Sequence, residues 1–199
     1  MPPKCSESRD FMKNQDTRVQ YTKRVLRSAI LELLKVKSID KVTVKEICDT
    51  AGLNRGTFYL HYDSPAGLLK DVENQFISDN MKYFDSYWNA QREISFMDQL
   101  FECISKNRDI CRILMSSNAD PQFLRSMTAL VRGSTTQEWA KEFPELDQQH
   151  LDFVFEFTIA GSTAIISKWL DGSIDLSAKQ LSHRIERLGH HTLMAIRDF

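Results

Sequence analysis

Side chains able to donate hydrogen bonds to a charged partner are concentrated in residues 55–61. Phe58 and Tyr62 are four positions apart, so on a helix they share one apolar face. The other positions of that helix then carry Arg55, Thr57, Tyr59 and His61. A guanidinium can donate two hydrogen bonds to one base edge, and hydroxyl or imidazole N–H groups suit phosphate oxygens. These side chains are thus of types that can contact base edges and phosphates.

No arrangement of residues indicates catalysis or metal binding. The sequence contains no G-x-S-x-G, no H-E-x-x-H, no phosphate-binding P-loop and no dinucleotide fingerprint. His183, His190 and His191 have no carboxylate or thiol placed to complete a metal site, so surface histidines are the favoured interpretation. We therefore expect no enzymatic activity, no metal and no cofactor.

The four cysteines, Cys5, Cys48, Cys103 and Cys111, form no C-x-x-C pair and have no histidine at zinc-finger spacing. An intracellular, reduced protein fits this pattern best. Cys103 and Cys111 are eight residues apart, with a helix break predicted between them, so a thiol switch is one hypothesis. Two unrelated buried thiols explain the same spacing and are the favoured alternative.

The formal net charge of −1 conceals an uneven distribution of charge. Residues 1–70 hold 13 Lys and Arg against 8 Asp and Glu, whereas residues 71–199 hold 13 against 19. A basic N-terminal part attached to an acidic body favours a polyanionic partner for the first part, and phosphate backbones are the commonest such partner.

Neither a secretion signal nor a membrane span is predicted. Residues 1–15 contain prolines and charged residues of both signs rather than a basic start followed by an apolar run. The longest uncharged apolar stretch, Phe157–Ser167, falls short of the ~18 residues of a membrane span. We expect a soluble, cytoplasmic protein without a membrane partner.

Capping and turn signals predict three helices within residues 16–63, after a flexible tail at residues 1–15. The first, over residues 18–36, has apolar residues at 3–4 spacing. Thr43 and Glu46 form a capping-box pattern that starts the second helix. Gly52 suits the left-handed residue that ends it, and Asn54 is a good N-cap for the third, over residues 55–62.

The rest of the chain, residues 64–199, also has the pattern of helices only. A long amphipathic helix is predicted from Pro65, and further helices over residues 95–106, 108–116, 121–141, 147–170 and 177–196. The predicted fold is all-α with about nine helices. It comprises an N-terminal three-helix helix-turn-helix head and a C-terminal helical bundle.

The stretch Thr43–Tyr62, TVKEICDTAGLNRGTFYLHY, closely resembles the signature of the tetracycline-repressor (TetR) family of transcription regulators. The resemblance covers about residues 17–69, and cap, turn, core and polar positions coincide in register. It implies a DNA-binding domain over residues 16–63, and an effector-binding and dimerisation domain over residues 64–199. It also implies double-stranded DNA, a second copy of the chain and an unknown small-molecule effector as partners.

The resemblance implies roles for single residues of the head. Three of them approach bases, namely Arg55, Gly56 and Thr57, and three hold phosphates, namely Thr43, Tyr59 and His61. Lys23 on the first helix adds a possible backbone contact, for which a solvated helix face is the equal alternative. The family usually has Lys at the position of Pro65, and Lys70, one turn later, is a candidate substitute. Cys48 replaces the usual Ala, so we expect it to be small and buried.

Residues 157–169 resemble the penultimate helix of a TetR subgroup, with a patch of small residues before Lys-Trp-Leu. Small residues let a second helix approach closely, and the last helix offers a complementary apolar stripe. We therefore predict a four-helix dimer interface from the last two helices. Its expected residues are Ala160, Gly161, Ala164, Trp169, Leu181, Ile185 and Leu188.

Aromatic residues in the body suggest an effector pocket between helices, for which Trp88, Phe123, Met127 and Phe157 are the candidates. Ordinary core packing is the favoured alternative for each of them. The expected function is that of a repressor released from a palindromic operator by a small molecule. The alternative is an activator or co-activator of the same fold that acts through a protein partner.

Overall fold

The computed structural model describes the backbone of residues 5–89 and 96–197, and the side chains of residues 17–80 and 97–197 except 130 and 134. Within these ranges the chain forms nine α-helices, one short 3-10 helix and no strand. The all-α prediction is therefore confirmed. The chain divides into two compact units, Met1–Gln75 and Phe76–Phe199. The first unit extends beyond residue 63, where the sequence suggested a boundary.

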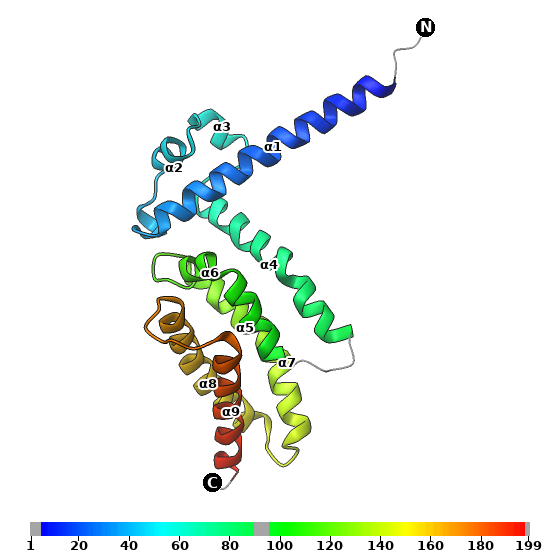
Figure 1. Ribbon diagram of the computed structural model, residues 1–199, viewed down its shortest axis with the longest axis vertical. Coiled ribbons are helices and arrows are strands. Elements are labelled where there is room, and N and C mark those ends of the chain that lie inside the picture. Colours follow the sequence, from blue (N-terminus) through cyan, green and yellow to red (C-terminus); the bar gives the residue numbers. More distant parts are fainter. Residues whose placement is uncertain (1–4, 90–95, 198–199) are drawn as a thin grey trace. The chain divides into compact units, whose positions relative to one another are not determined.

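The N-terminal unit contains α1 (Cys5–Leu34), the 3-10 helix η1 (Ile39–Lys41), α2 (Val44–Ala51), α3 (Arg55–Tyr59) and the start of α4 (Pro65–Asn89). α2 packs against both α1 and α3 (Figure 1). α1 begins earlier than the sequence indicated and includes most of the expected flexible tail. No proline or glycine occurs between its ends, so nothing in the sequence interrupts the helix.

The turn between α2 and α3 has the backbone geometry that the sequence predicted. Thr43 and Glu46 form a complete capping box at the start of α2. Gly52 ends α2 with φ 65° and ψ 32°, a left-handed conformation that is strained for residues with a Cβ atom. Asn54 caps α3 by accepting a hydrogen bond from the backbone N–H of Thr57. Together these caps make a tight turn between two short helices.

A polar cluster ties the start of α4 to the rest of the N-terminal unit. The carboxylate Oδ2 of Asp71 accepts a 2.7 Å hydrogen bond from Nε of Arg27 in α1. The same oxygen accepts a 2.5 Å hydrogen bond from the hydroxyl of Tyr62, which follows α3. Asp71 thus joins three segments, and its neighbours in sequence Leu68, Leu69 and Val72 are buried. These contacts explain why the first compact unit includes the beginning of α4.

The environment of Asp71 favours its charged form. Partial burial is the largest single influence and raises the pKa of Asp71, but the hydrogen bonds from Arg27 and Tyr62 together outweigh it. The net pKa of Asp71 is therefore below its ordinary value of 3.8. For Tyr62, burial and the bond to Asp71 raise the pKa of the phenol, so its hydroxyl keeps the proton it donates.

The C-terminal unit contains α5 (Phe96–Lys106), α6 (Arg108–Leu114), α7 (Pro121–Glu142), α8 (Gln148–Leu170) and α9 (Ala178–Ile196). These bounds agree with the predicted ranges to within a few residues. α8 runs beside α9 and also packs against α6 and α7, while α5 packs against α9 (Figure 1). Asp147 and Ser177 cap α8 and α9 by accepting hydrogen bonds from backbone N–H groups.

Three residues expected at the dimer surface belong instead to the core of a single protomer. Trp169, Leu181 and Ile185 are only 2%, 2% and 4% exposed, and they pack in one cluster with Phe101. The indole Nε1–H of Trp169 also donates a 2.8 Å hydrogen bond to the carbonyl of Leu176. The dimer assignment of these three residues is therefore wrong, because their side chains are already covered within the protomer.

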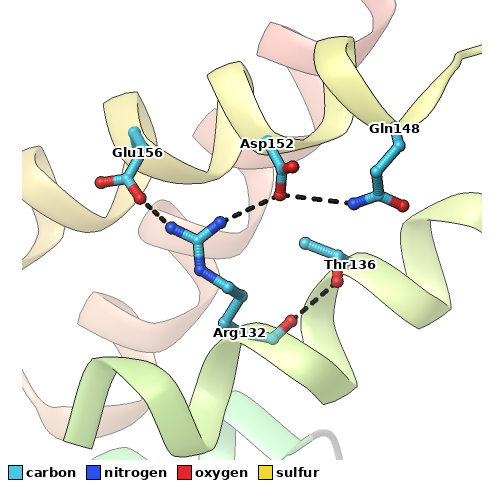
Figure 2. A network of polar contacts seen from close by, with 5 residues as sticks. All are labelled: Arg132, Thr136, Gln148, Asp152 and Glu156. Atoms are coloured by element: carbon cyan, nitrogen blue, oxygen red, sulfur yellow. Dashed lines mark hydrogen bonds and ion pairs between the residues drawn. The ribbon is translucent and has the colours of Figure 1, made fainter. Parts of the chain in front are cut away.

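Arg132 joins α7 to α8 through two acidic residues one turn apart (Figure 2). Its guanidinium donates a 2.9 Å hydrogen bond to Asp152 and a second bond to Glu156. It also lies 4.6 Å from the ring centroid of Phe155, a buried residue of α8. The guanidinium thus compensates two like charges at i and i+4 that would otherwise repel each other.

Among the helices that the structure describes, α8 alone is long and apolar enough to cross a membrane by length and composition. The core helix of a soluble protein passes the same test. α8 buries one face within the protomer through Leu151, Val154, Phe155 and Ile166. Its opposite face is also rich in apolar residues, which raises the hydropathy of the whole helix above that of an ordinary amphipathic one.

Removing the Tyr62 hydroxyl or the Asp71 charge should destabilise the N-terminal unit. We expect Tyr62→Phe to lower the free energy of unfolding by about 1–2 kcal/mol, because a hydrogen bond to a charged group is lost, and Asp71→Asn to lower it further. Urea unfolding at pH 7, at one protein concentration, measures both changes.

The pH dependence of the Asp71→Asn effect separates charge from packing. A carboxylate with a lowered folded pKa stabilises the protein fully above its ordinary pKa, and this contribution disappears as the pH falls through the folded value. The stability difference between the parent protein and Asp71→Asn should therefore shrink below about pH 4. An equal difference at pH 7 and pH 3 would show that the charge is unimportant.

Candidate nucleic-acid interface

The candidate interface is centred on α3, which is held by one buried side chain. Phe58 is 0% exposed, whereas Tyr59 on the same helix is 57% exposed. Arg55 is exposed, and His61, just after α3, is half-buried. The ring of Tyr59 contacts that of Phe58 edge to face, with centroids 5.6 Å apart. The polar groups predicted to bind nucleic acid are thus at least partly accessible, on or directly after a helix whose Phe58 side chain is buried.

The N-terminus of α3 is organised around Asn54. Its Oδ1 atom accepts a 2.7 Å hydrogen bond from the Thr57 N–H and a 3.1 Å bond from the Thr57 hydroxyl. The Thr57 proton is therefore already donated, which leaves its methyl group and oxygen lone pairs for another partner. A Cβ atom at Gly56 would lie 3.2 Å from the same Oδ1 atom. Gly56 thus keeps the backbone accessible without crowding the cap.

Thr43 is exposed but its hydroxyl is also engaged. The hydroxyl donates a 2.8 Å hydrogen bond to Glu46, and the N–H of Thr43 donates a 3.0 Å bond to the same oxygen. Lys37 donates a 2.6 Å bond to the other oxygen of Glu46. The bond from Lys37, followed by those from Thr43, lowers the pKa of Glu46 to about 2. Lys37 thereby neutralises an acidic charge that would oppose a phosphate near Thr43.

The two lysines proposed as phosphate contacts differ in their surroundings. Lys23 Nζ lies 5.8 Å from the centroid of the Tyr62 ring, and its side chain is partly exposed. Lys70 Nζ forms a 3.1 Å ion pair with Glu73, whose side chain is 1% exposed. A phosphate would have to compete with this buried carboxylate for Lys70. Lys70 therefore already forms an ion pair within the protomer.

Sequence reasoning missed three residues of this region. Lys37 supports the cap at Thr43, Asp71 holds α1 and Tyr62 together, and Leu60 is 80% exposed directly after α3. The partners of Asp71 are up to 44 residues away in sequence, so no local pattern could identify them. Leu60 could have been identified, because its helical register places it opposite Phe58.

The proposed effector residues differ in their exposure. Phe123 is buried, and its ring contacts that of Phe76 at 6.1 Å, while Met127 is half-buried. Phe157 is 66% exposed on α8, so its assignment to an internal pocket is wrong for the single protomer. The side chain of Trp88 lies outside the described residues.

The remaining residues of the predicted dimer surface lie on the outside of α8 and α9. Ala160, Gly161 and Ala164 are exposed, and Leu188 is 59% exposed. Phe153 and Phe157, at 65% and 66% exposure, continue the same stripe toward the start of α8. We call this set of exposed residues the outer stripe: Phe153, Phe157, Ala160, Gly161, Ala164 and Leu188.

The structure gives the surroundings of three cysteines and of His190. Cys48, Cys103 and Cys111 are free and buried, as expected. Burial raises the pKa of the Cys111 thiol to about 12, and it also raises that of Cys103, so both thiols stay protonated. His190 Nδ1 lies 3.2 Å from a carboxylate oxygen of Glu142. The described residues contain no group of three potential ligands that could hold a metal ion.

Two family models match this chain and together span most of it. Residues 26–72 match the model described as bacterial regulatory proteins of the tetR family. Residues 93–191 match the model described as the C-terminal region of a transcriptional regulator. The first match contains the α2–α3 turn, and the second contains α5 to α8 and most of α9.

Individual relatives agree with the family models. An uncharacterized HTH-type transcriptional regulator of Bacillus subtilis, YxbF, is 38% identical over 47 residues, which are 24% of this chain but only 12% of that relative. The structure of a TetR transcriptional regulator from Streptococcus agalactiae superposes with a TM-score of 0.67 at 22% identity, covering 89% of this chain and 98% of that one. The dihydroxyacetone kinase operon activator DhaS has a TM-score of 0.53 at 17% identity, covering 87% and 97%.

The two structural likenesses establish the shared fold, and the family models establish the relationship. The α2–α3 geometry and the matches to both halves of the chain agree with each other. The chain therefore belongs to the TetR family of DNA-binding transcriptional regulators.

Proposed function

We propose that the protein is a cytoplasmic, homodimeric repressor that binds a palindromic operator and leaves it when a small molecule binds the C-terminal unit. The observation that supports this most is the presentation of α3. Phe58 anchors the helix in the core, while Arg55 and Tyr59 remain exposed. In the major groove, Arg55 pairs with a guanine, and Tyr59 and His61 donate to flanking phosphates.

The outer stripe of α8 and α9 supports the homodimer. Large exposed apolar patches on soluble proteins are typical of interaction surfaces. Here two phenylalanines lie in the N-terminal half of α8 and three small residues in its C-terminal half. Pairing with a second copy about a twofold axis would cover the aromatic residues and let the small residues approach a neighbouring helix. The two α3 helices would then reach successive major grooves ~34 Å apart.

Effector control would act through α4, which is continuous from the N-terminal unit into the C-terminal one. Asp71 attaches the start of this helix to α1 and Tyr62. A shift of α4 on ligand binding would therefore change the position of α3. The ligand can shift the equilibrium only by its differential affinity for the two states, typically ~1–3 kcal/mol. Phe123 and Met127 remain candidates to contact it.

The alternative is an activator that works with a protein partner. The structurally similar DhaS is described as an operon activator, so this fold also occurs in an activator. Pro65 replaces a lysine that is usual in the family, and Lys70 is paired with Glu73, so fewer cations reach phosphates. Weak binding by the protein alone would favour this alternative.

Selection of bound duplexes from a random library by the purified protein tests the central proposal. We expect a palindromic consensus whose binding weakens steeply with salt, because phosphate contacts release counterions. Failure to enrich any site, with or without added cell extract, would contradict autonomous operator binding. Enrichment only with extract would favour the partner-dependent activator.

Two variants of α3 should weaken binding to the selected site in different ways. Arg55→Ala should lose about 5- to 150-fold in affinity and accept other bases at one position per half-site. Tyr59→Phe removes only a hydroxyl, so it should weaken specific and random DNA by the same factor. Arg125→Ala, an exposed arginine of α7, is the matched control. Parent-like binding by both α3 variants would show that α3 is not the DNA-binding helix.

The homodimer is tested with two matched glycine substitutions. A Cβ placed at Gly161 or at Gly133 meets no atom of another element within 4 Å, and both positions are exposed, so a side chain can extend into solvent from either one in a single protomer. Gly161→Arg should give a monomer in sedimentation equilibrium, because the outer stripe can no longer approach a second helix. Gly133→Arg, on α7, should remain dimeric. A dimer in both cases would place the interface elsewhere.

A further inference from the structure

Leu60 occupies an unusual position for a large apolar side chain. Its backbone N–H bonds to the carbonyl of Gly56, so the helical register continues from α3 through this residue. Residues two positions from Phe58 on either side point away from it, because each residue turns the helix by about 100°. Gly56 and Leu60 are those residues. Phe58 is fully buried, and Leu60 is 80% exposed.

Gly56 leaves Leu60 as the only side chain on this outermost line of α3. The polar candidates lie to its sides: Tyr59 packs its ring edge to face with Phe58, and Thr57 is bonded to Asn54. A single exposed leucine is ordinary on a protein surface. Here it lies on the side of α3 opposite the core, which would face the DNA if α3 binds it as proposed.

The chemistry of the major groove offers one apolar partner for such a side chain. Base edges there present hydrogen-bond donors and acceptors, which a leucine cannot satisfy, and the 5-methyl group of thymine. Covering a donor or acceptor with an apolar side chain would cost free energy, whereas covering a methyl group is favourable. Leu60 therefore favours thymine over the other three bases at the position it faces.

We propose that Leu60 is a specificity-determining residue that packs against the 5-methyl group of one thymine in each half-site. This inference rests on the proposed operator binding through α3. Arg55 would select a guanine by hydrogen bonding, and Leu60 would select a thymine by apolar contact. The half-site would then contain a required T·A pair that no hydrogen-bonding side chain of α3 explains.

The test combines a protein variant with a change of one methyl group in the DNA. Each thymine of the selected half-site is replaced in turn, symmetrically, by deoxyuridine, which keeps every hydrogen-bonding group. Affinities of the full-length parent protein and Leu60→Ala are measured by fluorescence anisotropy on each duplex. Val36→Ala is the matched control, because Val36 is 84% exposed but lies after α1 and outside α3.

At one thymine, replacement by deoxyuridine should weaken the parent protein about 4-fold per half-site, or roughly 15-fold for the palindrome, as expected for one buried methyl group. Leu60→Ala should bind the thymine duplex more weakly and show no further loss at that deoxyuridine. Val36→Ala should respond to deoxyuridine as the parent does. The effects of Leu60→Ala and of deoxyuridine on binding would then not add, which would show that Leu60 contacts that thymine methyl group.

Three results would overturn the inference: parent-like binding by Leu60→Ala, equal deoxyuridine effects in both proteins at every thymine, or a half-site without a required thymine. Circular dichroism of Leu60→Ala verifies that a loss of binding does not come from unfolding. If the parent protein enriches no site, the proposed function fails and this inference with it. If Arg55→Ala weakens binding and Leu60→Ala does not, only this inference fails.

Discussion

The burial of Phe58 is the interaction on which the candidate interface depends. α3 has five residues, too few for a helix to persist alone in water, because forming the first turn costs more conformational entropy than one hydrogen bond returns. Its shape therefore comes from Phe58 in the core and from the Asn54 cap. Once that side is fixed, the helical register decides which residues face outward. The burial of Phe58 thus determines which side chains of α3 are exposed.

Local signals made most of the fold predictable from the sequence. Thr43 with Glu46, Gly52, Asn54, Asp147 and Ser177 act through neighbours within a few residues, and the helices start and end where they indicate. The orientation of α8 and α9 was less predictable, because both carry apolar residues on more than one face. Trp169 was consequently assigned to a dimer surface although it is buried in the protomer, and Phe157 to an internal pocket although it is exposed. A pattern shows that a face is apolar, but only packing decides which face is internal.

For the candidate site, too, the sequence alone allowed only part of the structure to be predicted. Residue types suggested which side chains can donate hydrogen bonds, yet several of those donors have internal partners. The Thr43 proton goes to Glu46, the Thr57 proton to Asn54, and Lys70 pairs with Glu73. The first two bonds follow from capping rules and could have been foreseen. The cluster of Arg27, Tyr62 and Asp71 could not, since its members meet only after the N-terminal unit has folded.

A dimer formed through the outer stripe would make the cellular stability of this protein depend on its concentration. A protomer by itself leaves Phe153, Phe157 and Leu188 in water. If dimerisation covers them, mass action makes the folded fraction depend on protein concentration. At low copy number, dissociated chains would then expose aromatic surface to chaperones and proteases and be removed first. A cell would in that case hold either a working population of dimers or very little of this protein.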